Sequence, residues 1–247
     1  MKTASQTIQP ARRVGRGSSV ALTAGVGLLV LLASEVVFAE SSPAPHVAPA
    51  GVLKPALTPD QALQRLLAGN QRYVTEQAVH PGQSIERRLE VAKGQSPIAI
   101  VLTCADSRVA PELFLDQGLG DLFVIRNAGN VLDEHVLGSM EYAVEHLQVG
   151  LILVVGHGKC GAVSAAVGGG EVPGHIRSVT DSIAPAVAET KGLAGDPVDN
   201  VVRANAQLVA STLNHVEPFL KTAVRDGRLK IAAARYDLGS GQLEILK

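Results

Sequence analysis

Short segments built almost wholly from apolar residues set the strongest limit on how this chain can fold. They lie at residues 98–103, 122–125, 151–155 and 229–234. Runs of this length and composition are typical of strands that are buried on both faces of a sheet. Stretches with helical spacing separate them, and strands joined through helices form right-handed crossovers. The sequence therefore predicts one α/β domain around a mostly parallel sheet.

The flanking segments complete this predicted fold. Helices are expected at 84–93, 133–147, 175–190 and 198–225, and an N-terminal helical arm at 58–76, where Thr58 caps a helix with Pro59 in its first turn. After a turn at Gly239–Gly241, residues 242–246 read as a hairpin partner of the last strand. We expect four parallel strands plus an antiparallel edge strand, flanked by helices, in a domain spanning residues 58–247.

The first 39 residues have the pattern of an export signal. Arg12, Arg13 and Arg16 precede an apolar run, and Val37-Phe38-Ala39 places small residues at positions −3 and −1 of a cleavage site before Glu40. Residues 40–57, rich in Pro and Ala, read as a flexible spacer. The expected location is the periplasm, with no stable membrane span once the signal is removed. The alternative is a protein tethered to the membrane by an uncleaved N-terminal segment.

Charge and cysteine content exclude several classes of protein. The formal net charge of −1 gives no basic surface that would attract nucleic acid. Two cysteines are too few for a small fold held together by disulfides. Aromatic residues make up only 3% of the chain, so Val, Leu, Ile and Ala must form the core.

Both cysteines follow predicted strands. The first strand leads into Cys104-Ala-Asp106-Ser-Arg108, and the third leads into Gly156-His157-Gly-Lys-Cys160. Parallel sheets bind ligands at the carboxyl ends of their strands. If these two strands are neighbours, Cys104, His157 and Cys160 converge, and two thiolates with one imidazole form an open zinc site with a fourth position for water. Asp106 and Arg108 are expected to form a functional ion pair beside it.

The same residues also fit two other interpretations. In an exported protein, Cys104 and Cys160 can form a disulfide, although that would give no role to His157, Asp106 or Arg108. The glycines at 156, 158 and 161 also match a dinucleotide-binding fingerprint, which requires an acidic residue about 20 positions later at the end of the next strand. Asp181 has roughly that spacing, but it lies in a predicted helix.

The paired motifs resemble those of the β-class carbonic anhydrases. Cys104-Ala-Asp106-Ser-Arg108 is similar to the family's Cys-x-Asp-x-Arg motif, and Gly156-His157-x-x-Cys160-Gly161 is similar to its second zinc motif. The resemblance extends over residues 58–247 through Arg126-Asn-Ala-Gly-Asn130, Glu141-Tyr-Ala143 and Tyr236-Asp237.

The resemblance implies reversible hydration of carbon dioxide to bicarbonate and a proton by zinc-bound hydroxide. Cys104, His157 and Cys160 would hold one zinc ion per chain. Asp106 would accept a hydrogen bond from the zinc-bound water, with Arg108 holding its carboxylate; in some members the corresponding Asp closes onto the metal at low pH. A homodimer or a dimer of dimers is implied, with the N-terminal arm as a clasp. The alternatives are hydrolysis of carbon disulfide or carbonyl sulfide on the same zinc scaffold, and a non-catalytic metal-binding module.

Some members of the family also carry a non-catalytic bicarbonate pocket built from Trp, Arg and Tyr. Arg126 and Tyr236 resemble two of these residues. The chain has no Trp, and Val101 occupies the third position. The resemblance therefore does not predict bicarbonate regulation of this kind.

Overall fold

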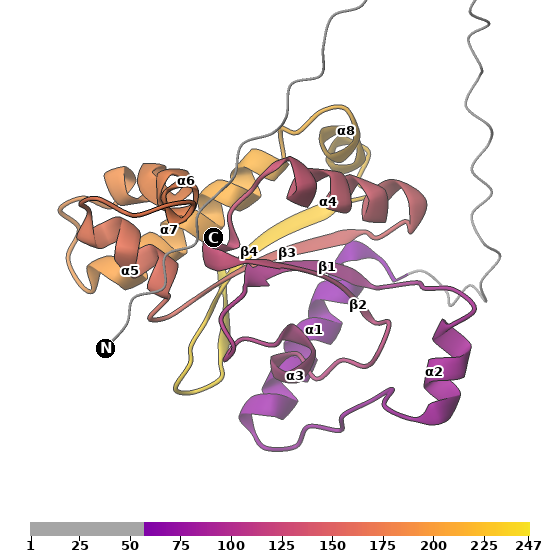
Figure 1. The fold of residues 1–247 in the computed structure, drawn as a ribbon. Helices are drawn as coiled ribbons and strands as arrows, with labels where there is room; N and C mark the ends of the chain where they lie inside the picture. Colours follow the sequence, from indigo (N-terminus) through magenta and orange to yellow (C-terminus); the bar gives the residue numbers. More distant parts are fainter. Residues whose placement is uncertain (1–56) are drawn as a thin grey trace, which may run out of the picture. The chain divides into compact units, whose positions relative to one another are not determined.

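A five-stranded sheet organises residues 57–247, the part of the chain that the computed structural model describes (Figure 1). The predicted signal peptide, and the spacer up to residue 56, lie outside the described residues. The strands are β1 (Ala99–Cys104), β2 (Leu122–Asn127), β3 (Leu151–His157), β4 (Lys230–Tyr236) and β5 (Leu243–Leu246). The helices are α1 (Pro59–Val74), α2 (Ile85–Val91), α3 (Pro111–Phe114), α4 (Glu134–His146), α5 (Gly161–Gly168), α6 (Ile176–Glu189), α7 (Pro197–Leu213) and α8 (Phe219–Arg225), with a 3-10 turn η1 (Ala128–Asn130).

The strand order is β2-β1-β3-β4-β5, which confirms the predicted sheet. The first four strands run parallel to one another, and β5 pairs antiparallel with β4 at the edge. From β1 the chain passes first to β2 on one side and later to β3 on the other. The direction in which strands are added to the sheet reverses between β1 and β3. In open α/β sheets, ligands bind in the crevice beyond such a switch point.

Alternate residues of the central strands face opposite sides of the sheet, and each side is buried. Ala99 and Val101 belong to a core completed by α1, α3 and the first part of α7. Ile100 and Leu102 belong to a second core with α4, α8 and the second part of α7. Figure 1 shows α4 and α8 on one side of the sheet and α1 and α3 on the other. Burial on both sides explains why these strands are apolar throughout rather than alternating.

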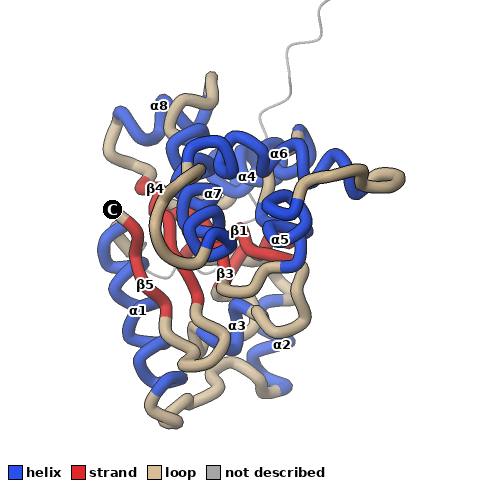
Figure 2. The backbone as a smooth tube through the Cα atoms, turned by 90° about the vertical axis from the view of Figure 1, so that its left-hand side faces the viewer, coloured by secondary structure: helices blue, strands red, loops and turns tan. Residues whose placement is uncertain are grey.

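The helical arm α1 begins where the sequence predicts and packs on the sheet of its own chain. Thr58 and Gln61 form a reciprocal capping box. At the far end, the buried Asn70 donates to the carbonyl oxygens of Phe114 and Gly241, at 2.9 and 2.8 Å, and accepts from the Leu243 N–H. Figure 2 shows α1 running beside β5. These contacts hold α1 within the domain.

One predicted helix is in fact two. Residues 198–225 read as a single helix, but α7 ends at Leu213 and α8 begins at Phe219. Pro218 lies between them, and proline lacks the N–H that a continuing helix requires while restricting the residue before it. The short helix α3 was not predicted either. Among the described residues, no helix has the length and apolar character needed to cross a membrane.

Two helical glycines provide a test of this packing. Gly138 lies on the exposed face of α4, where an added Cβ would meet no atom within 4 Å. We expect Gly138→Ala to stabilise the protein by about 0.5–1 kcal/mol, because alanine loses less backbone entropy in a helix. The measurement is the free energy of unfolding in urea.

Gly69 is the matched control in α1. A Cβ there would lie 1.8 Å from the carbonyl oxygen of Leu115. Gly69→Ala is therefore expected to destabilise the protein by more than 1 kcal/mol, on the order of an overpacked core site. A Gly69→Ala protein as stable as the wild type would show that α1 does not pack on its own domain.

Candidate metal centre

Cys104, His157 and Cys160 meet at the carboxyl ends of β1 and β3, as predicted. All three residues are buried. Their candidate ligand atoms lie within 4.8 Å of one another, and the two Sγ atoms are 3.9 Å apart. In the part of the chain that the structure describes, no other group of three His, Cys, Asp or Glu side chains converges in this way.

The backbone accounts for this convergence. Cys104 and His157 are the last residues of β1 and β3, which pair in parallel next to each other. Lys159 then adopts a left-handed φ of 55°, and Cys160 caps the N-terminus of α5. The turn brings the second sulfur back to the strand ends. The neighbouring strands that the sequence analysis required are therefore present.

His157 presents one ring nitrogen that no protein atom satisfies. Its Nδ1 lies 3.0 Å from the carbonyl oxygen of Gly158, a contact that requires the proton on Nδ1. Nε2 then carries a free lone pair, and it is buried without a hydrogen-bond partner. Buried polar atoms are normally paired, so an orphaned nitrogen facing two sulfurs fits a metal ion. This donor set suits zinc with a fourth position left open.

The two thiols influence each other. The hydrogen bond from Cys160 lowers the pKa of Cys104, although burial opposes the shift. The same bond raises the pKa of Cys160, as burial does. The backbone N–H of Gly129 also donates to Cys104 Sγ at 3.4 Å. One sulfur of the pair is thus favoured as a thiolate before any cation arrives.

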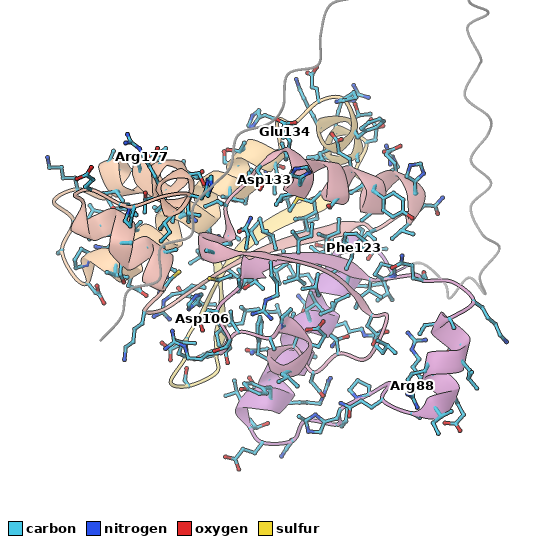
Figure 3. The ribbon with its side chains drawn as sticks, viewed as in Figure 1. Arg88, Asp106, Phe123, Asp133, Glu134 and Arg177 are labelled. Atoms are coloured by element: carbon cyan, nitrogen blue, oxygen red, sulfur yellow. The ribbon has the colours of Figure 1, made fainter. Side chains whose placement is uncertain are left out.

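Asp106 and Arg108 form the predicted ion pair at the mouth of this cluster. Arg108 donates from Nε and Nη2 to the two carboxylate oxygens at 2.9 and 2.7 Å, and its backbone N–H donates at 3.0 Å. These hydrogen bonds hold the pKa of Asp106 well below its usual range. Its Oδ2 lies 3.9 Å from His157 Nε2. Figure 3 shows Asp106 at this end of the sheet, with Arg88 of α2 at the opposite end.

Arg126 has a structural role that the sequence analysis did not predict. Its Nε donates to the carbonyl oxygen of Cys104 at 3.0 Å and its Nη2 to that of Asp106 at 2.6 Å. Arg126 therefore braces the loop that carries Asp106. Tyr236, in contrast, is buried and stacks on Phe114, with ring centroids 4.5 Å apart. The motif Arg126–Asn130 was the available signal, but it does not show which atoms the guanidinium contacts.

The structure does not favour the two other interpretations. Both thiols are free, and the disulfide reading leaves His157 Nε2 unexplained. Asp181 lies on an exposed part of α6 and pairs with Arg177 at 3.4 Å. The dinucleotide fingerprint needs its acidic residue at a strand end, and Asp181 does not occupy one.

Comparison with known proteins gives a consistent result. The family model described as "Carbonic anhydrase" matches residues 99–243. The chain is 40% identical over 192 residues to "Carbonic anhydrase 2" of Mycobacterium tuberculosis, a match that covers 76% of this chain and 93% of the relative.

Solved structures share the fold. The β-carbonic anhydrase CcaA is 26% identical, with a TM-score of 0.62 over 75% of this chain and 95% of CcaA. A second structure comes from work on two β-carbonic anhydrases of Sordaria macrospora that are described as tetrameric. Its chain is 23% identical to this one, with a TM-score of 0.61 over 74% of this chain and 96% of the Sordaria chain. At that identity the likeness concerns the fold alone. The family match and the 40% relative establish that this chain belongs to the carbonic anhydrases, a family of enzymes, in their β class.

Proposed function

We propose that the protein catalyses the reversible hydration of carbon dioxide to bicarbonate and a proton, with zinc as its metal. One observation carries the proposal: Cys104, His157 and Cys160 converge at the switch point of the sheet, with His157 Nε2 buried and unpartnered. Zinc held there supplies the Lewis acidity that makes water a nucleophile near neutral pH.

Asp106 and Arg108 are proposed to orient the reacting water. Arg108 engages both carboxylate oxygens, so the carboxylate stays ionised and has a fixed direction. Asp106 Oδ2 lies near the ligand cluster and is able to accept a hydrogen bond from that water. With zinc bound, an acceptor at this point would orient that water for attack on the carbon of the substrate. Carbon dioxide is uncharged, so no charged residue is needed to anchor it.

A homodimer or a dimer of dimers is proposed as the assembly. Large hydrophobic side chains that are 50–64% exposed lie on α2, on α3 and in the loops beside them: Val79, Ile85, Leu89, Leu113 and Leu119. Two more, Ile176 and Leu193, lie on α6 and just after it. Exposed apolar surfaces of this kind mark protein interfaces. The arm α1 packs on the sheet of its own chain, and its use as a clasp between subunits stays a prediction. Light scattering gives the mass in solution, and a mass of one chain would contradict this proposal.

Zinc content and turnover, measured on the same purified sample, test the proposed function. We expect stopped-flow assays to show fast hydration of carbon dioxide with about one zinc per chain. Zinc without hydration between about pH 6 and 9, where zinc-activated water should be reactive, would favour hydrolysis of carbon disulfide or carbonyl sulfide. A purified sample that contains no zinc and shows no hydration activity would contradict the proposal.

Asp106→Ala separates the proposed role of the carboxylate from zinc binding. Turnover is expected to fall by about 100-fold or more, the contribution usual for a positioned acid–base group, with the zinc content unchanged. Asp181→Ala is the matched control, because Asp181 pairs with Arg177 on an exposed helix away from the cluster. Full turnover in Asp106→Ala would show that this residue has no such role.

Removal of the metal should expose the two thiols to oxidation. The Sγ atoms lie 3.9 Å apart and are free in this structure. After chelation, oxidised glutathione is expected to convert them to a Cys104–Cys160 disulfide: each thiol loses a hydrogen, and the oxidant is reduced to two thiols. Intact mass and thiol titration report the change. In a zinc-loaded control the thiols are expected to stay free. Thiols that also stay free in the chelated protein would contradict the prediction.

Export to the periplasm is also proposed, on the sequence pattern alone. The positively charged start, the apolar run and the small residues before Glu40 support it. N-terminal sequencing of protein from the periplasmic fraction is expected to begin at Glu40. A retained N-terminus in the membrane fraction would instead indicate a tethered protein.

A further inference from the structure

A buried asparagine on α7 reaches the backbone beside the candidate metal centre. Asn205 is 3% exposed, and its Nδ2 donates to the carbonyl oxygen of Gly129 at 3.0 Å. The two residues are 76 positions apart in the sequence. α7 packs closely on β3, where a Cβ at Gly156 would lie 3.0 Å from Val202. The Asn205 side chain therefore projects from α7, the helix that also covers β3, the strand that ends in His157.

Gly129 transmits this contact to a candidate ligand. Its φ is 75°, and a Cβ there would lie 2.8 Å from Ile183 and 3.2 Å from Ala162. No other residue fits this position without displacing its neighbours. In this conformation its N–H donates to Cys104 Sγ at 3.4 Å. The orientation of Gly129 thus decides whether the sulfur receives that hydrogen bond.

The turn around Gly129 is anchored at its ends by a different residue. Asn127 exchanges side-chain hydrogen bonds with the N–H and carbonyl groups of Val131, at 3.0 and 2.9 Å. Its own carbonyl oxygen accepts from the Ala105 N–H at 2.9 Å. In the middle of the turn, the side chain that holds the backbone of Gly129 is Asn205.

We infer that Asn205 is a positioning residue for the metal centre: by fixing Gly129, it directs a backbone N–H at the sulfur of Cys104. An N–H donated to a thiolate sulfur stabilises its charge and sets the direction of its remaining lone pairs. Groups that orient ligands in this way typically alter metal affinity by 10- to 100-fold. The inference rests on the proposed zinc function and adds a residue that lies in none of the motifs.

Asn205→Ala tests this inference, with Asn70→Ala as the matched control. Asn70 is also a buried asparagine that donates to backbone carbonyls, but its partners, Phe114 and Gly241, are not ligands of the cluster. Zinc affinity is measured by competition with a chelator, and Co²⁺ substitution reports the thiolate-to-metal absorption band. For Asn205→Ala we expect zinc binding weaker by about 10- to 100-fold and a shifted cobalt band. For Asn70→Ala we expect a lower unfolding temperature with an unchanged band.

Equal zinc affinity in wild type and folded Asn205→Ala would overturn the inference, as would equal losses in both variants. If Asn205→Ala does not fold, Asn205→Ser is measured in the same way; its shorter hydroxyl is expected to leave the Gly129 carbonyl unpaired and to shift the cobalt band. An unshifted band in that variant would also overturn the inference. If the wild type hydrates carbon dioxide, the proposed function stands whether or not the inference about Asn205 holds. A wild type that binds no zinc refutes both.

Discussion

The parallel pairing of β1 with β3 is the constraint on which the rest of this structure depends. These strands end in Cys104 and His157, and their register places Thr103 opposite Val155, one residue before Cys104 and two before His157. The chain turns in opposite directions after the two strands, so the backbone diverges there and leaves room for a ligand. A different neighbour for β1 would separate the sulfur from the imidazole and abolish the site.

Around that junction, each candidate ligand has an outer contact that directs it. Gly158 fixes the tautomer of His157, and Gly129 donates to Cys104. Cys160 lies at the N-terminus of α5; its hydrogen bond with Cys104 raises the pKa of this thiol, and the backbone N–H groups of Val163 and Ala162 oppose that shift. The backbone supplies all three contacts. The centre is therefore oriented mainly by the fold, and glycine is required where the backbone must approach closely.

At the open side of the site, charged side chains rather than backbone groups provide the contacts. Asp106 is paired with Arg108, and Arg126 holds the backbone carbonyl oxygens of Cys104 and of Asp106 itself. The Arg108 side chain is 53% exposed, so this ion pair contributes little to stability. Its effect is to keep one carboxylate ionised and in a fixed direction beside the cluster. Such positioning is characteristic of a site organised for chemistry.

The sequence by itself determined the sheet, the residues that meet at the candidate centre and most helix boundaries. Runs that are apolar on both faces predict buried parallel strands, and residues such as Thr58 and Asp133 cap helices through local hydrogen bonds. The break of 198–225 into two helices was also available from the sequence, through Pro218. Only the tertiary structure decided the rest: the packing of α1 on its own sheet, and the contacts of Arg126 and Asn205. These contacts join residues far apart in the chain, and local spacing carries no information about which distant carbonyl a buried side chain will reach.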